Sequence, residues 1–344
     1  MLIGLFALAA LADVQGAAPI YREIKQWVVA CDNTRACFAK YDSTDDEGAG
    51  GGYLSVTREA GPNGRLAVTI GLDDHLPSPA ALRLDGAVLP PLPWLIDAKA
   101  EQATLEGASA LRLIRLMGNA EKLTFAPGKD APFAALNGMK AALLAIDEDQ
   151  GRLDSQTALA RVGPRAADQA LPALPEPVVY AHPTAKPLLQ SAAFAAAVRA
   201  SQGALLKKHD CEDEAPIADE AYGLNDTLAL VLIGCIQGAY QTSVIPFIAP
   251  RNDAGAARPV IFPVEPTRRA ADASGEYIVD GWDAKSATFS ETNKGRGLAD
   301  CGSSSAWTWD GKSFHLSAFN DLERCGGGPP GDWPTLYRTQ VVIR

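Results

Sequence analysis

The stretch LADCGSSSAWTWDGKSFHL, residues 298–316, indicates a β-hairpin and with it the architecture of the second half of the chain. Asp310-Gly311 is typical of a two-residue type I′ turn between antiparallel strands. Such a turn pairs Trp309 with Lys312, and side chains then alternate between the two faces of the hairpin. The apolar face consists of Trp307, Trp309, Phe314 and Leu316. The alternation therefore predicts an amphipathic hairpin whose tryptophans belong to the core.

The polar face of this hairpin contains residue types found in hydrolases. In the predicted register Ser304 and His315 are diagonal neighbours, about 7–8 Å apart at Cα. A serine nucleophile also needs an orienting acid and an oxyanion hole, and the chain has no GxSxG elbow. We therefore predict no catalytic residue, and a hydrolase that uses Ser304 and His315 stays as the alternative.

The six cysteines of the chain fall into three pairs of near neighbours. An even number of cysteines in an exported protein predicts disulfides. Sequence order suggests the pairs Cys31–Cys37, Cys211–Cys235 and Cys301–Cys325. No CxxC pair is present and the four histidines are scattered, so a zinc site is not expected. The sequence predicts a disulfide scaffold with no metal and no cofactor.

The N-terminus has features of a secretory signal. The run from Leu2 to Ala12 is apolar but too short to span a bilayer as a helix. It fits the apolar region of a signal peptide, and Ala10-Leu11-Ala12 fits a small-x-small cleavage site, although no Lys or Arg precedes the run. We predict a signal peptide over 1–18, no integral membrane segment in the mature chain, and a periplasmic or secreted location.

The net charge of the chain indicates which classes of macromolecule can be its main partner. The chain has 31 Lys and Arg against 41 Asp and Glu, a net charge of -10. Nucleic acids and anionic membranes require clustered basic residues, and the sequence contains only isolated basic doublets. Both are therefore excluded as main partners. A basic protein remains compatible with the charge, and an inhibitor of a basic enzyme such as a lysozyme is a further alternative.

A proline-rich segment divides the chain. Residues 163–187 carry six prolines and little periodic pattern, which is typical of an extended linker. The segment separates a first domain, 20–162, from a second domain, 188–344.

Periodicity in both domains favours strands with few helices. In the first domain, the pattern predicts a hairpin of 53–59 and 65–72. It also predicts a helix over 136–151 and a returning strand over 157–163, and it places the acidic residues of 146–151 on a solvated face. In the second, 191–211 is helical, 227–236 is a buried strand and 276–343 is a β-meander. Pro246 argues for an edge position of its strand. The predicted fold class is α+β, with two mainly antiparallel β domains that each carry a packed helix and are stabilised by disulfides.

Several motifs resemble one exported bacterial family. WVVACDNTRACFA (27–39), LNGMKAALLAIDEDQGR (136–152) and TNKGRGLADCGSSSAWTWDGKSFHL (292–316) resemble the family known as domain of unknown function 1176. The first domain, 20–162, is also similar to the invasion-associated locus B-like proteins through its W-x-V-x-C start and its later helix. The resemblance implies a periplasmic or secreted protein of Gram-negative bacteria. It implies no catalytic residues.

These observations favour a binding function over an enzymatic one. We expect a non-catalytic binding or accessory module that acts on an envelope or extracellular protein. Its first candidate site is the loop CDNTRAC, where Asn33 and Arg35 are polar groups on a small disulfide loop. The favoured alternative is that these two residues only satisfy the turn. The oligomeric state is left open.

Overall fold

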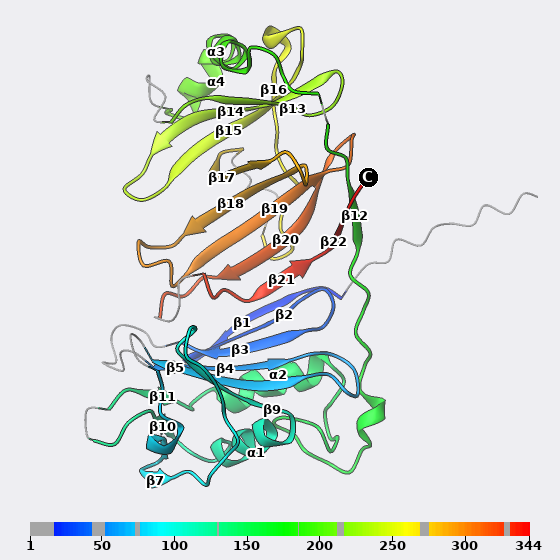
Figure 1. Ribbon diagram of the computed structural model, residues 1–344. Coiled ribbons are helices and arrows are strands. Elements are labelled where there is room, and N and C mark those ends of the chain that lie inside the picture. Colours follow the sequence, from blue (N-terminus) through cyan, green and yellow to red (C-terminus); the bar gives the residue numbers. More distant parts are fainter. Residues whose placement is uncertain are drawn as a thin grey trace, which may run out of the picture.

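The chain forms mostly antiparallel β sheets with few helices and three disulfides (Figure 1). The computed structural model describes residues 17–42, 52–72, 76–128, 131–184, 186–211, 217–268, 275–326 and 331–344. Nearly all of the predicted signal peptide lies outside these ranges. No helix within them is long and apolar enough to cross a membrane.

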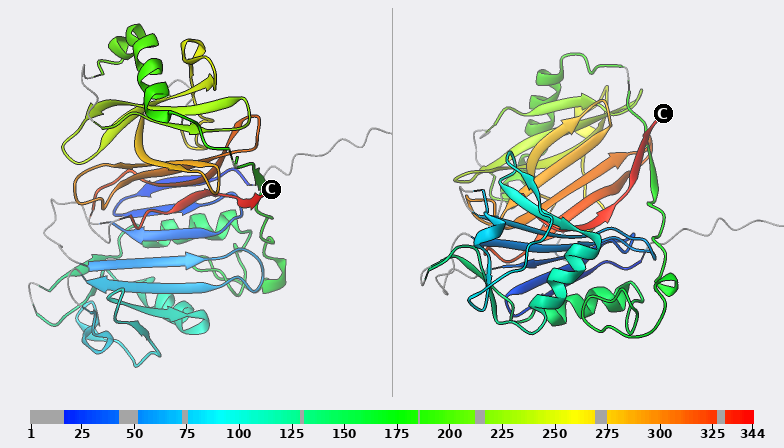
Figure 2. Two further views of the ribbon diagram at one scale, coloured as in Figure 1. Left: turned by 45° about the horizontal axis from the view of Figure 1, so that its top comes forward. Right: turned by 60° about the horizontal axis from the view of Figure 1, so that its bottom comes forward.

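The first half is built on a seven-stranded antiparallel sheet. Its strands, in spatial order, are β1 (Ile20–Ile24), β2 (Trp27–Cys31), β3 (Cys37–Tyr41), β4 (Gly52–Arg58), β5 (Leu66–Leu72), β9 (Gln102–Glu106) and β8 (Leu95–Asp97). Helices α1 (Gly107–Met117) and α2 (Met139–Asp149) cover one face, where Leu54, Val56, Leu113 and Ile146 form part of the core (Figure 2). The predicted hairpin over 53–72 is confirmed, because β4 pairs with β5 along its length.

A smaller sheet and short 3-10 turns complete the first half. The sheet has the order β11 (Phe133–Ala135), β10 (Lys122–Thr124), β6 (Arg83–Leu84) and β7 (Ala87–Val88). Single 3-10 turns lie at Pro79–Ala81 and Ala167–Gln169.

The end of α2 corrects two predictions. Asp147 is fully buried rather than solvated, and its carboxylate accepts the backbone N–H groups of Leu159, Ala160 and Arg161 at 2.7–3.2 Å. Because a side chain takes these donors, residues 157–163 do not form the predicted strand and show only an isolated bridge at Val162. The end of the helix itself agrees with its sequence, since Gly151 follows the C-cap at φ 62°.

The second half contains a nine-stranded antiparallel sheet. Its path is β13 (Glu220–Gly223), β14 (Leu228–Gln237), β15 (Thr242–Pro250), β17 (Tyr277–Asp283), β18 (Thr288–Lys294), β19 (Gly302–Trp309), β20 (Phe314–Leu322) and β21 (Thr335–Arg338), with β16 (Arg258–Pro259) beside β15. Helices α3 (Ser191–Ser201) and α4 (Gly203–Lys208) pack on the β13–β15 end, and a 3-10 turn lies at Ala254–Ala256.

Pro246 lies inside this sheet and not at its edge. It pairs with Leu232 of β14. On the other side, β15 pairs with β17 at Val244 and with β16 at Phe247, so Pro246 occupies the gap between two partial partners. On that side the Pro246 carbonyl accepts the N–H of Val260 at 2.8 Å, so the missing N–H also points away from β14 and the β14–β15 ladder keeps its bonds.

The 302–322 hairpin forms with a different register from the prediction. Trp309 pairs with Phe314, so the turn spans Asp310 to Ser313 and not two residues. The Asp310 carboxylate accepts the N–H groups of Lys312 and Ser313, both at 2.8 Å, which stabilises the longer turn. A register shift between Ala306 and Trp307 also leaves Ser317 unpaired as a bulge. Trp307 and Trp309 are nevertheless in the core as predicted, and Trp307 stacks on Phe262 and Phe289.

The proline-rich segment follows one side of the molecule from the first half to the second (Figure 1). Within it, β12 (Val178–Ala181) pairs in parallel with the last strand, β22 (Gln340–Ile343). We call this two-stranded ribbon the strap.

The two halves meet at a contact that we call the seam. Val28 and Ala30 point to the face of the first sheet opposite the helices, and they pack against Phe319, Leu322 and Leu336 of the second half. The close-packed contact brings β1–β2 against β20–β21, as both views of Figure 2 show.

Candidate functional site

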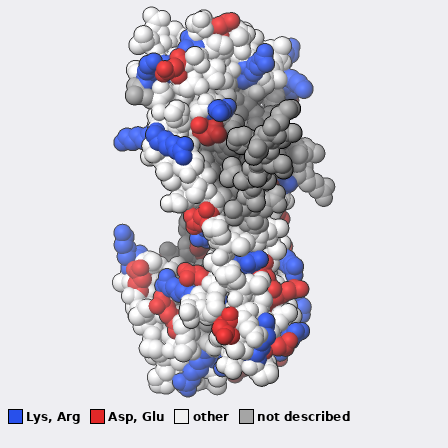
Figure 3. All heavy atoms as spheres, turned by 90° about the vertical axis from the view of Figure 1, so that its right-hand side faces the viewer, with Lys and Arg blue, Asp and Glu red and all other residues white. Residues whose placement is uncertain are grey.

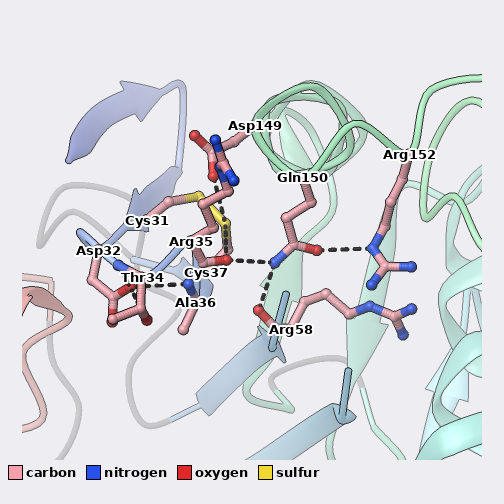
Figure 4. The surroundings of a disulfide bond; sticks show 10 residues. All are labelled: Cys31, Asp32, Thr34, Arg35, Ala36, Cys37, Arg58, Asp149, Gln150 and Arg152. Atoms are coloured by element: carbon pink, nitrogen blue, oxygen red, sulfur yellow. Dashed lines mark hydrogen bonds between the residues drawn. A yellow bond between two sulfur atoms is a disulfide. The ribbon is translucent and has the colours of Figure 1, made fainter. Parts of the chain in front are cut away.

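The loop predicted as a binding site satisfies its own turn. Cys31 and Cys37 are directly opposed on β2 and β3 and are disulfide-bonded (Figure 4). Between them, the Asp32 carboxylate accepts the N–H groups of Thr34 and Ala36 at 2.8 and 2.9 Å and the hydroxyl of Thr34 at 2.7 Å. This Asx-type arrangement holds the loop without a ligand.

Asn33 joins the two halves of the molecule. Its amide nitrogen donates to the carbonyl of Arg338 at 3.0 Å, and its amide oxygen accepts the N–H of the same residue at 2.9 Å. The Arg338 guanidinium also pairs with Asp32 at 2.5 Å. Because Asn33 is buried and both ends of its amide are occupied, its side chain stabilises the seam.

Arg35 is held by the first half of the chain. Its φ is 67°, and Nη1 donates to the carbonyl of Pro172 at 3.3 Å. Its own carbonyl accepts a hydrogen bond from Gln150, whose amide also bonds the Arg58 carbonyl (Figure 4). Gln150 in turn accepts from buried Arg152, and burial together with the charge of Arg58 lowers the pKa of Arg152 to about 10. The network fixes the loop to the end of α2.

Ser304 and His315 do not meet. Ser304 pairs with Asn320 and accepts its amide hydrogen bond at 3.0 Å. His315 pairs with Thr308, four residues further along β19, which is a separation of about 13 Å. His315 contacts Asp310 at 2.8 Å and Ser313 at 3.1 Å, but both contacts use Nε2. A catalytic triad needs the two ring nitrogens separately, so this group does not form one.

A cavity of about 560 Å³ lies between the strap and the 310–313 turn. We call it the strap cavity. Its walls come from three separate parts of the chain, namely Val178, Val179, Tyr180 and His182 from the β12 segment, Asp310, Gly311, Lys312 and His315 from the hairpin, and Arg344 after β22. The turn and the strap fit closely, because His182 lies against Gly311 and its N–H bonds the Trp309 carbonyl at 2.9 Å.

The charges in the strap cavity favour an anion. The carboxylate of Asp310 already accepts hydrogen bonds from Ser313, Lys312 and His315. Burial alone would raise the pKa of Asp310, but these hydrogen bonds lower it. Lys312 and Arg344 have no carboxylate partner among the residues that the structure describes. The Arg344 guanidinium lies 3.5 Å from the centre of the Tyr180 ring, which fixes its plane. The cavity therefore offers the two cationic side chains of Lys312 and Arg344 to a ligand.

A second cavity, of about 360 Å³, lies at the seam between β3–β4 and 332–338. Two of its three arginines are engaged, Arg65 by Glu106 and Arg338 by Asp32, while burial lowers the pKa of the third, Arg58. Because Glu59 and Asp332 also line the seam cavity, it is a weaker candidate for an anionic ligand. Among the described residues, the two groups of three possible metal ligands each include a disulfide and so offer no thiolate.

Figure 3 shows the side of the molecule where the strap runs. On the part of this side that is not grey, acidic and basic side chains are mixed over both halves. Sequence reasoning missed the strap cavity because His182, Lys312 and Arg344 lie in three segments that are far apart in the chain. The one usable signal was the pair His182 and Tyr180 in a segment otherwise rich in proline.

Comparisons with known proteins give a family but no activity. A family model described as "Protein of unknown function (DUF1176)" matches residues 21–340. The chain is 29% identical over 356 residues to "Uncharacterized protein YpfG" of Escherichia coli (strain K12), an alignment that covers 94% of each chain. No solved structure matches.

Proposed function

This chain belongs to the DUF1176 family, whose description assigns no activity, and from its own residues we propose an exported binding module that holds an anionic group in the strap cavity. The partner is an envelope or extracellular protein. One observation carries the proposal: Lys312 and Arg344 line a cavity in which Asp310, the only acidic side chain among the described residues that line it, is already hydrogen-bonded.

The chemistry of these two residues suits a carboxylate or a phosphate. The planar guanidinium of Arg344 can donate two parallel hydrogen bonds to such a group, while Lys312 adds a point charge. Hydrolysis is not proposed, because Ser313 and Asp310 share one nitrogen of His315.

Export and a two-domain organisation belong to the same proposal. Three disulfides suit an oxidising compartment such as the periplasm, and the apolar N-terminal run supplies a signal. In this proposal 20–162 and 188–344 are separate units joined by 163–187. The similarity of the first unit to invasion-associated locus B-like proteins stays a prediction.

Calorimetric titration of the mature protein with citrate and with inorganic phosphate tests the binding site. We expect Lys312→Ala to weaken anion binding about tenfold, because one charge-assisted contact is lost. Lys285→Ala is the matched control, since Lys285 occupies the same position after Asp283 in the β17–β18 turn and donates its N–H to that aspartate at 2.9 Å. Equal affinities for Lys312→Ala and Lys285→Ala, or no anion binding at all, would contradict the proposal.

A further inference from the structure

We propose that the partner binds as an extended acidic peptide, which adds as a strand to the free edge of β12 and places an acidic side chain at Lys312 and Arg344. The inference rests on the proposed function, since it identifies what delivers the anion to the strap cavity.

The hydrogen bonds of the strap show which edge of β12 is free. In a parallel ladder, alternate residues of a strand direct their N–H and C=O groups to the same neighbour. The Pro177 and Ala181 carbonyls accept the N–H groups of Gln340 and Arg344, at 2.8 and 3.0 Å, so the odd-numbered residues of β12 face β22. On the opposite side, the N–H of His182 bonds the Trp309 carbonyl.

Val178 and Tyr180 therefore direct their backbone groups away from β22. The structure gives no backbone hydrogen bond for either residue on that side within its described ranges. The two residues are 45% and 43% exposed, whereas Ala181 is buried. Both residues also line the strap cavity. The unpaired edge thus opens on the same cavity that contains the cationic groups.

This arrangement matches the recognition of peptides by strand addition. In that mode backbone hydrogen bonds supply affinity, and side-chain pockets supply specificity. The free edge is short, because the N–H of His182 already bonds the Trp309 carbonyl, so docking is limited to the backbone groups of Val178 and Tyr180. An acidic peptide matches Lys312 and Arg344, while a basic peptide would be repelled by them.

The test uses a synthetic peptide in which valine and glutamate alternate, blocked at both ends, and the same peptide with lysine in place of glutamate. Affinity for the full mature protein is measured by calorimetry, and amide hydrogen exchange is followed at Val178 and Tyr180. We expect the glutamate peptide to bind and to slow exchange at these two amides. The lysine peptide should bind at least about tenfold more weakly.

Two variants of one residue separate the backbone from the side chain. Val178→Pro removes the N–H that points away from β22 and leaves the ladder of the strap intact, so the glutamate peptide should bind about tenfold more weakly. Val178→Ala keeps the N–H and should bind nearly as the wild type. Thermal unfolding shows whether Val178→Pro is folded, and exchange in the wild type tests the inference without any variant.

The outcomes distinguish this inference from the proposed function. Binding of citrate or phosphate without binding of the glutamate peptide overturns strand addition and leaves the anion site. Peptide binding with no change in exchange at Val178 and Tyr180 also overturns it. Absence of binding by every probe overturns both proposals.

Discussion

At the scale of single residues, three buried polar side chains determine where the chain around them lies. Asp32, Asn33 and Asp147 all belong to polar stretches of the sequence, and all three are buried. The side chain of each residue accepts a hydrogen bond from a backbone N–H that would otherwise need a backbone acceptor. Asp32 does so within its own loop, Asn33 across the seam, and Asp147 at residues 159–161. A buried N–H without an acceptor is costly, so these side chains determine where the surrounding chain lies.

Asp147→Ala should lower the free energy of unfolding by about 2–4 kcal/mol, because it leaves the buried N–H of Leu159 and the part-buried N–H groups of Ala160 and Arg161 without their acceptor. Urea denaturation of the two proteins measures the difference. Glu148→Ala is the control: Glu148 is the exposed neighbour, with one long ion pair to Arg22 at 3.9 Å, and should cost less than about 0.5 kcal/mol. Equal effects would show that the Asp147 bonds contribute nothing specific.

At the scale of elements, turns control the position of the strap. Asp85-Gly86 and Asp310-Gly311 are the same dipeptide, and both glycines have positive φ values, 85° and 98°. Their surroundings differ. A Cβ on Gly86 would meet no atom within 4 Å, whereas a Cβ on Gly311 would lie 2.9 Å from the His182 ring. The 310–313 turn therefore packs directly against His182, which follows β12. The sequence of the turn alone does not indicate this contact.

Gly311→Ala should weaken anion binding in the strap cavity several-fold and lower the free energy of unfolding by about 1–3 kcal/mol, since it adds a clash with His182 to the cost of positive φ. Gly86→Ala carries the φ cost alone, about 1 kcal/mol, and should leave binding unchanged. Calorimetric titration and thermal unfolding of both variants provide the comparison. Loss of binding in Gly86→Ala, or full binding in Gly311→Ala, would disprove the role of this turn.

At the scale of the whole molecule, the seam buries charge as well as apolar surface. Asp42 follows β3 and is fully buried, and Arg324 of the second half lies 3.9 Å from its carboxylate. Burial raises the pKa of Asp42 to about 7; Lys40 and Arg324 oppose this rise, while Glu23 and Asp300 reinforce it. The contact between the halves is therefore sensitive to pH.

Asp42→Asn should make the protein less sensitive to pH between about 4 and 7. In this window the unfolded chain releases the Asp42 proton, near its ordinary pKa of about 4, while the folded protein retains it. Stability from this group is therefore complete below pH 4 and falls as the pH rises through 7, by an amount on the order of a few kcal/mol.

Denaturation of both proteins at several pH values measures the effect. The stability of Asp42→Asn relative to the wild type should grow as the pH rises. Some slope will remain, because burial also raises the pKa of Glu291 to about 7 and that of Asp321 to about 6. A constant difference between the two proteins from pH 4 to pH 8 would contradict the assignment.

The sequence by itself determined what depends on near neighbours in the chain. Alternation located the hairpin of β4 and β5, the spacing of apolar residues located α2, and Gly151 marked its end. The three local cysteine pairs follow from the same short-range logic.

Only the tertiary structure decided the features that depend on distant partners. The prediction of a two-residue turn at Asp310-Gly311 was wrong because the Asp310 side chain accepts hydrogen bonds from the residues that follow it. The predicted edge position of Pro246 was wrong because its strand has two partial neighbours. Asn33 faces Arg338, more than three hundred residues away in the chain. The strap cavity joins residues of the linker, the hairpin and the last strand. Local periodicity reports which face of an element is apolar, but it does not report which other element covers that face.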